Sequence, residues 1–217
     1  MQKKYKCFLF DLDGTLLDTA PEFLSCLNSL LNKHNLNEVS DKFVRERVSD
    51  GVGRLIEDGF KISSQNAKFE TLRSQLLEEY QKNFLISKLF PGVKTVLKRL
   101  SEMQIDWMIV TNKPKKFAEE ICKNFKWNQS SLGLFTPDDA KGKRKPNPAI
   151  LNMALKNSKY DKNLSVYVGD NWRDVEGAKN CGIDSILATY GYLRKKDALN
   201  LSPTNRILKI SELTSFF

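Results

Sequence analysis

A short apolar run near the N-terminus ends abruptly in two carboxylates and a glycine, in the order Cys7-Phe8-Leu9-Phe10-Asp11-Leu12-Asp13-Gly14-Thr15. This pattern predicts a buried strand that leads into a polar loop at its carboxyl end. Asp11 and Asp13 are two positions apart, so their side chains point the same way in an extended chain. Two carboxylates at such a short distance repel each other unless a cation lies between them. Mg²⁺ is a cation that prefers oxygen ligands of this kind. An ordinary aspartate- and glycine-rich turn after a strand is the alternative interpretation.

Residues 17–87 place their apolar side chains at helical spacing. Thr19 and Glu22 match a capping box at the start of a first helix, and Ser40 is placed to cap a second. A further amphipathic helix is predicted over residues 69–84. The sequence therefore predicts an all-helical block here, with no strand.

After this block, predicted strands and helices alternate, with strands at residues 105–110, 164–168 and 183–188. The alternation is typical of an α/β fold in which a doubly wound parallel sheet is covered by helices on both faces. Ligands bind such sheets at the carboxyl ends of the strands, near the point where the strand order reverses. Asp11, Thr111 and Asp170 each follow a different predicted strand, so we expect them at one edge of the sheet.

The composition is that of a globular protein of 217 residues, enough for one domain with a smaller insert. The formal charge of +9 favours anionic ligands. The basic residues are spread along the chain, which predicts a solvated basic surface and no specific nucleic-acid partner. No apolar run approaches the ~18 residues that span a membrane, and none follows the pattern of a signal peptide. We therefore expect a cytoplasmic protein without a membrane partner, while its oligomeric state stays open.

The four cysteines are scattered and form no C-x-x-C pair, so we expect reduced thiols in or near the core, not a disulfide or a zinc site. His34 is the only histidine and lies far from any serine or cysteine motif. This argues against a Ser-His or Cys-His nucleophile.

Four segments together resemble the motifs of the haloacid dehalogenase-like (HAD) superfamily in order and spacing: DLDGT at residues 11–15, TNK at 111–113, KPNP at 145–148 and GDNWRD at 169–174. The resemblance covers essentially the whole chain. It implies a Rossmann-like core of residues 1–16 and 88–217, with a helical cap inserted at residues 17–87. The TNKP turn, the segment at 190–192 and the size of the cap look most like phosphoglycolate phosphatases.

The resemblance implies a Mg²⁺-dependent phosphomonoester phosphatase that acts on 2-phosphoglycolate or a similar small phosphorylated metabolite. Asp11 would attack phosphorus to give an aspartyl-phosphate. Asp13 would protonate the leaving alkoxide and then deprotonate the hydrolytic water. By the same resemblance, Mg²⁺ is held by the side chains of Asp11 and Asp170 and by the backbone carbonyl of Asp13.

The remaining motif residues are assigned by the same resemblance. Thr111 and the backbone N–H of Asn112 would bind the phosphoryl oxygens, and Lys145 would supply a fixed positive charge beside them. Asp174 would bind the metal through water or orient its ligands. The alternatives are that Thr111 only caps a helix and that Asp174 is only an acidic residue at a helix N-terminus, where the helix dipole favours negative charge.

Lys145 is chosen over the basic residues just before it because two prolines follow it and stiffen its loop. The sequence departs from the family pattern in two places. Residues 135–139 lack the usual glycine, and residues 141–144 are more basic than expected. Both departures lie outside the phosphate-handling motifs and bear on which substrate reaches them.

Several alternative functions stay open. A β-phosphoglucomutase-like phosphotransferase, a pyrophosphatase or a nucleotidase of the same family would share the nucleophile and the metal site, and the cap would decide among them, with residues 50–54 as its candidate specificity segment. A phospho-accepting receiver domain is disfavoured because it would lack an acid/base at position 13. A nucleic-acid-binding protein on an inactive scaffold is disfavoured because no catalytic position is missing.

Overall fold

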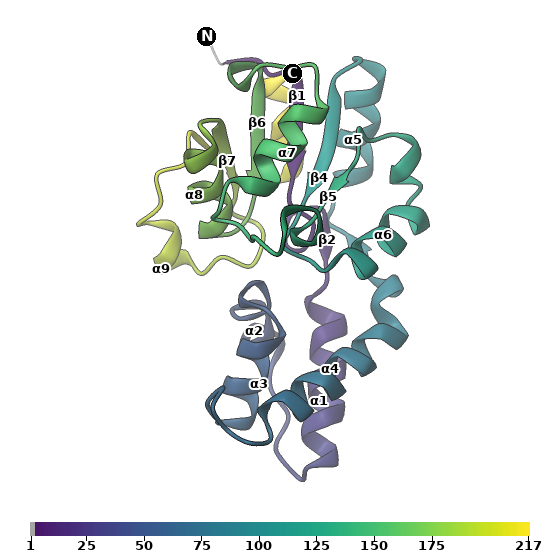
Figure 1. Ribbon diagram of the computed structural model, residues 1–217, viewed down its shortest axis with the longest axis vertical. Helices are drawn as coiled ribbons and strands as arrows, with labels where there is room; N and C mark the ends of the chain where they lie inside the picture. The colour runs from purple at the N-terminus through teal and green to yellow at the C-terminus, as the bar shows by residue number, and fades with distance from the viewer. Residues whose placement is uncertain (1–2) are drawn as a thin grey trace. The chain divides into compact units, whose positions relative to one another are not determined.

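The computed structural model describes residues 3–217. The chain forms two compact units (Figure 1). One comprises the chain up to Leu17 together with Leu89–Phe217, and the other is Asp18–Lys88. The first is an α/β unit and the second is helical, so the predicted fold class is confirmed.

The α/β unit is built on a parallel six-stranded sheet with the order β5-β4-β1-β6-β7-β8. The strands are β1 (Cys7–Phe10), β4 (Asp106–Val110), β5 (Leu134–Phe135), β6 (Ser165–Gly169), β7 (Asp184–Ala188) and β8 (Asn205–Ile207). β1 lies in the centre, and Leu9 is in register with Met108 of β4 and Tyr167 of β6. The chain builds the sheet outward through β4 and β5 and then returns to the other side of β1, so the strand order reverses at β1.

Helices cover both faces of this sheet (Figure 1). They are α5 (Val93–Glu102), α6 (Lys115–Asn124), α7 (Ala149–Asn157), α8 (Trp172–Cys181) and the short α9 (Lys195–Ala198). Short 3₁₀ turns lie at Trp127–Gln129, Pro137–Ala140, Lys162–Leu164 and Ile210–Phe216. Successive strand residues point to opposite faces, so Cys7 and Leu9 pack with α7 and α8, whereas Phe10 makes an edge contact with Trp107 on the other face.

The two outermost strands, β5 and β8, were not expected from the sequence. β5 has two residues and β8 has three, which is too short for any hydrophobic periodicity to show. Their backbone hydrogen bonds to β4 and β7 define them, and those bonds depend on the tertiary fold.

The helical unit contains α1 (Ala20–Lys33), α2 (Asp41–Arg45), α3 (Val52–Phe60) and α4 (Phe69–Asn83), with 3₁₀ turns at Val48–Asp50 and Phe84–Ile86. α1 packs on α4, where the ring of Phe23 stacks on that of Tyr80 at a centroid distance of 4.1 Å. The predicted cap at Ser40 is confirmed, because its Oγ accepts a hydrogen bond of 3.2 Å from the N–H of Phe43. The predicted capping box at Thr19 is wrong, because the Thr19 side chain makes no capping hydrogen bond to α1.

Two short strands, β2 (Leu17–Asp18) and β3 (Lys88–Leu89), pair with each other where the chain passes between the units. The expectation of no strand in residues 17–87 is therefore wrong at its first residues. Neither connecting segment is helical at this point, so the pairing provides hydrogen-bond partners for their backbone N–H and C=O groups.

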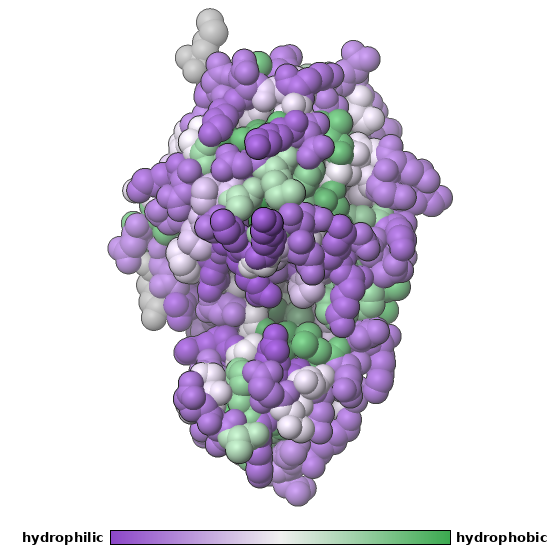
Figure 2. Space-filling model, in the orientation of Figure 1, coloured by the Kyte–Doolittle hydropathy of each residue, from purple (hydrophilic) through white to green (hydrophobic). Residues whose placement is uncertain are grey.

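Hydrophilic side chains cover much of the surface seen in Figure 2, with smaller apolar areas between them. Throughout residues 3–217, every helix is too short or too polar to traverse a bilayer.

Candidate active site

The predicted site residues lie at the carboxyl ends of three adjacent strands. Asp11 directly follows β1, Thr111 follows β4 and Asp170 follows β6. One carboxylate oxygen from each of Asp11, Asp170 and Asp174 lies within 4.8 Å of the other two. The structure thus gathers three acidic side chains from two strand ends and the first turn of α8.

Asp170 is fully buried and closely enclosed by backbone. A Cβ atom added at Gly14, where φ is +85°, or at Gly191 would overlap Asp170, so only glycine allows the chain to pass this close. The N–H of Tyr192 donates to Asp170 Oδ2 at 2.7 Å, and the Thr15 hydroxyl donates to Oδ1 at 3.3 Å. Burial raises the pKa of Asp170 well above its usual range, and the charges of Asp174 and Asp11 raise it further.

Lys145 is the cation among these carboxylates. Its Nζ lies 2.9 Å from Asp11 Oδ1 and 2.7 Å from Asp174 Oδ1, and its side chain is only 1% exposed. Burial opposes the charged form, but the carboxylates of Asp11 and Asp174 outweigh burial and raise the pKa of Lys145. The ammonium is therefore held charged beside the proposed nucleophile.

Asn112 positions the Lys145 backbone through a reciprocal pair of hydrogen bonds. The N–H of Lys145 donates to Asn112 Oδ1 at 2.8 Å, and Asn112 Nδ2 donates to the Lys145 carbonyl at 3.1 Å. Thr111 is buried, and its Oγ1 accepts a hydrogen bond of 3.2 Å from the N–H of Lys113. The second and third motifs are thus locked together by side chain and backbone.

Asp174 caps a helix, as the alternative interpretation described, and it also contacts Lys145. Its Oδ2 accepts a hydrogen bond of 2.9 Å from the N–H of Asn171 and so completes a capping box at the start of α8. Its Oδ1 accepts the hydrogen bond from Lys145. Burial raises the pKa of Asp174, and the charge of Lys145 opposes that rise. One oxygen holds the helix while the other faces the site.

Two residues of the site were not among the predicted ones. Lys113 Nζ lies 3.0 Å from both oxygens of Asp13, which stands outside the group of three carboxylates. The Tyr167 hydroxyl lies 2.5 Å from Lys145 Nζ and donates to the Val110 carbonyl at 2.6 Å. The sequence carried a signal for each, because Lys113 follows a strand end and Tyr167 interrupts an apolar strand with a hydroxyl that needs a buried partner.

The residues present fit a divalent cation. When ionised, Asp11, Asp170 and Asp174 carry three negative charges, and Lys145 balances one of them, which leaves two for a cation to offset. Asp11 Oδ1 is buried and accepts no well-oriented hydrogen bond from residues 3–217. Hard oxygen donors with an excess of two negative charges match the ligand preference of Mg²⁺.

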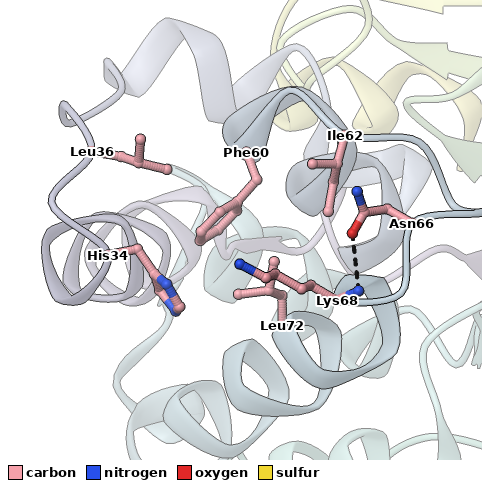
Figure 3. A pocket seen from close by; sticks show the side chains of 7 residues that line it. All are labelled: His34, Leu36, Phe60, Ile62, Asn66, Lys68 and Leu72. Carbon is pink, nitrogen blue, oxygen red and sulfur yellow. Dashed lines mark hydrogen bonds between the residues drawn. The ribbon is translucent and has the colours of Figure 1, made fainter.

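A separate pocket of about 320 Å³ lies within the helical unit (Figure 3). It is lined by His34, Leu36, Phe60, Ile62, Asn66, Lys68 and Leu72. It includes none of the predicted site residues. The ring of His34 makes an edge contact with Phe60, so the single histidine has a packing role.

Comparison with known proteins agrees with this geometry. Residues 8–188 match the family model for haloacid dehalogenase-like hydrolases. An N-acetylmuramic acid 6-phosphate phosphatase from Pseudomonas putida is 35% identical over 198 residues, covering 91% of this chain and 88% of that protein. A phosphoglycolate phosphatase from Xanthomonas campestris is 35% identical over 188 residues, covering 86% and 84%.

The fold is shared with solved structures as well. A haloacid dehalogenase-like hydrolase from Streptococcus pneumoniae superimposes with a TM-score of 0.84 at 20% identity, covering 98% of each chain. The family model covers most of the chain, and the curated relatives are phosphatases of nearly the same length. The chain therefore belongs to the haloacid dehalogenase-like hydrolase family.

Proposed function

We propose that this protein is a Mg²⁺-dependent phosphomonoester phosphatase that hydrolyses 2-phosphoglycolate or a similar small phosphorylated metabolite through an aspartyl-phosphate on Asp11. The observation that carries the proposal is the buried group of Asp11, Asp170 and Asp174 around a single lysine. An excess of negative charge beside a nucleophile is unfavourable for attack on a phosphate dianion unless a metal ion offsets it.

The metal would be held by the side chains of Asp11 and Asp170 and the backbone carbonyl of Asp13, with Asp174 close to it. When bound, Mg²⁺ supplies positive charge that lowers the repulsion between the nucleophile and the phosphoryl oxygens. Thr15 and the N–H of Tyr192 would keep Asp170 oriented, because each donates a hydrogen bond to it.

Asp11 would attack phosphorus in line, forming the O–P bond as the bond to the leaving alkoxide breaks. Asp13 would give its proton to that alkoxide and then take one from the water that hydrolyses the intermediate. Lys145, Thr111 and the N–H of Asn112 would neutralise and bind the phosphoryl oxygens. Lys113 would hold the Asp13 carboxylate in place, since it binds both oxygens.

The helical unit would act as the cap that selects the substrate, with the segment at residues 50–54 as its specificity element. In that unit Arg47 and Arg54 both bind Asp58 Oδ2, at 2.7 Å and 3.0 Å. This contact orients Arg54, the basic residue of the segment, which would bind an anionic group of the substrate.

N-acetylmuramic acid 6-phosphate is a second candidate substrate, because two phosphatases with that specificity are 35% and 32% identical to this chain. It shares with 2-phosphoglycolate a carboxylate in addition to the phosphate. A phosphotransferase, pyrophosphatase or nucleotidase of the same family is the alternative reaction.

The decisive experiment is phosphate release from a panel of 2-phosphoglycolate, N-acetylmuramic acid 6-phosphate, hexose phosphates, nucleotides and pyrophosphate, each with Mg²⁺ and with a chelator. We expect Mg²⁺-dependent release, with the highest kcat/KM for one of the two carboxylated substrates. Preference for a different phosphomonoester would overturn the substrate assignment and keep the reaction. No release from any substrate by folded, Mg²⁺-loaded protein would overturn the function.

The nucleophile is tested by Asp11→Asn, which preserves shape and removes the attacking charge. We expect turnover to fall below detection while the circular dichroism spectrum and Tm stay close to those of the unchanged protein. Turnover near the original rate would remove Asp11 as the nucleophile.

A further inference from the structure

The loop at residues 141–144 presents a concentrated positive charge that the proposed chemistry leaves unused. Its sequence is Lys141-Gly142-Lys143-Arg144, and all four residues are exposed. No ion pair within residues 3–217 engages Lys141, Lys143 or Arg144, whereas many other lysines and arginines of the described chain have a carboxylate partner. Three cationic residues without a carboxylate partner thus lie within the four positions that precede Lys145 in the sequence.

The backbone of this loop is fixed at both ends. The N–H of Gly142 donates to the Pro137 carbonyl at 2.8 Å, and that of Lys143 donates to the Ala140 carbonyl at 3.1 Å. At the other end, the N–H of Lys145 binds Asn112 Oδ1, and the N–H of Asn147 donates to the Arg144 carbonyl. The backbone of the loop is therefore held in place by hydrogen bonds, and its charged side chains extend from it into solvent.

The nearest acidic residues in the sequence do not neutralise the loop. Asp139 is engaged by Lys115 Nζ at 2.6 Å, and its other oxygen caps the preceding turn through the N–H of Thr136. Asp138 accepts a hydrogen bond from the N–H of Lys115 at the start of α6. Asp139 and Lys115 cancel each other, and the Asp138 carboxylate offsets one of the three loop cations, so the loop keeps an excess of two positive charges.

The loop charges lie within electrostatic range of Asp11. Lys145 Nζ is 2.9 Å from Asp11 Oδ1. The Lys145 side chain adds about 6 Å and each further residue at most about 3.8 Å, so the Cα atoms of the loop lie at most about 13 Å (Arg144) to 24 Å (Lys141) from Asp11. These distances are shorter than the Debye length of about 30 Å at 0.01 M salt and longer than the ~8 Å at 0.15 M. Attraction of an anion by this loop must therefore depend strongly on ionic strength.

We propose that Lys141, Lys143 and Arg144 form an electrostatic recruitment surface that raises the concentration of anionic phosphomonoesters at Asp11 without contacting the reacting atoms. This inference rests on the proposed phosphatase function. Three cations acting on a dianion at about 20 Å raise kcat/KM about threefold at 0.01 M salt and hardly at all at 0.15 M. A trianion gains about fivefold by the same reasoning. The surface thus favours substrates that carry a carboxylate in addition to the phosphate.

The test compares the unchanged protein with the triple variant K141Q/K143Q/R144Q, using p-nitrophenyl phosphate as the dianion and 2-phosphoglycolate as the trianion. We expect kcat/KM of the variant to be lower by about threefold and fivefold respectively at roughly 0.01 M NaCl, and to approach that of the unchanged protein at roughly 0.15 M. The change falls on KM, and kcat stays the same.

The matched control is K6Q/R99Q/K156Q, which also replaces two lysines and one arginine and so lowers the formal charge of +9 equally. Lys6 precedes β1, and Arg99 and Lys156 lie in the last turns of α5 and α7, at the opposite edge of the sheet. We expect this control to lower kcat/KM less than the loop variant does, because its charges lie at the far ends of the strands. An equal loss in both variants would overturn a local role for the loop.

Two further outcomes separate this inference from the proposed function. An active K141Q/K143Q/R144Q variant with unchanged kcat/KM at low salt would overturn the recruitment surface alone. Absence of phosphate release by the unchanged protein would overturn the proposed function and this inference with it. If the triple variant melts at a lower Tm, each single substitution should still lower kcat/KM at low salt by about 1.5-fold. Three single variants without an effect would also overturn the inference.

Discussion

Lys113 Nζ lies 3.0 Å from both carboxylate oxygens of Asp13, although the two residues are 100 positions apart in the sequence. The Lys113 side chain is 4% exposed and that of Asp13 is 25% exposed, so the acid keeps access to solvent while the lysine holds it from inside. Such an arrangement fits a carboxylate that exchanges protons during turnover.

We expect Lys113→Met to lower kcat by about 10- to 100-fold, because a loosely held acid/base is misplaced by about an ångström. Lys116→Met is the matched control, since Lys116 is an exposed lysine of α6. Steady-state kinetics across pH checks the result. If Lys113 positions Asp13, the pH profile of kcat should change in Lys113→Met, and Lys113→Arg should recover part of kcat. An unchanged kcat in Lys113→Met would contradict this role.

Asp13→Asn should slow turnover by about 10²- to 10⁴-fold, the usual contribution of a general acid/base. Because leaving-group departure needs less help for p-nitrophenol than for an alkyl alcohol, the first step should survive better with p-nitrophenyl phosphate. Rapid-quench kinetics should then show a burst of p-nitrophenol and a phosphorylated protein that Asp11→Asn does not form. Unchanged steady-state rates would exclude Asp13 from proton transfer.

Mg²⁺ should stabilise the folded protein, because the three-carboxylate group that would hold it exists only in the folded chain. At a concentration of about 100 times Kd the gain is about 2.7 kcal/mol, which raises Tm by about 5–10 °C in a chain of this size. Asp170→Asn should abolish most of this shift. Equal shifts in both proteins, measured by thermal unfolding with Mg²⁺ and with a chelator, would place the metal elsewhere.

Tyr167→Phe should lower the free energy of unfolding by about 1–2 kcal/mol, because it removes a hydroxyl that is hydrogen-bonded to Lys145 and to the Val110 carbonyl in a fully buried position. Tyr160→Phe is the control, as its hydroxyl donates to Asp106 at a partly exposed position. Urea unfolding of both variants measures the difference. A Tyr167→Phe loss no larger than that of the control would show that the hydroxyl is not needed there.

The four cysteines should be unreactive in the folded protein, because all are buried and free. Burial raises the pKa of Cys7 to about 12 and that of Cys26 and Cys122 to about 11, and it also raises the pKa of Cys181. At pH 8 an ordinary thiol, with a pKa of about 8.5, reacts readily with a disulfide reagent. We expect no rapid labelling of native protein and four equivalents after denaturation. One rapidly labelled thiol would contradict this.

Much of the fold could be predicted because its signals are local. The apolar runs that became β1, β4, β6 and β7 and the helical spacing of residues 17–87 are written in short windows of sequence. The strands β5 and β8 could not be found in this way, since two or three residues carry no period. The predicted capping box at Thr19 failed for a different reason. A capping box requires a particular side-chain geometry, and the sequence pattern alone does not set that geometry.

The site divides along a similar line. Asp11, Thr111 and Asp170 could be placed at one sheet edge because each ends a predicted strand, and parallel strands end together. Which carboxylate would join which cation could not be predicted. The structure pairs Asp13 with Lys113, and it gathers Asp174 with Asp11 and Asp170.

The sequence by itself determined the α/β class, the four motifs, the family and the edge of the sheet that carries the acidic residues, because spacing and periodicity are properties of the chain. Only the tertiary structure decided that Lys145, already assigned to the site from its motif, is buried between Asp11 and Asp174, that Tyr167 contacts it, and that the three basic residues before it have no carboxylate partner among residues 3–217. These features depend on strand order and on side chains brought together from distant segments. Ion pairs act over a few ångströms, and distances of that scale between remote residues exist only in the folded chain.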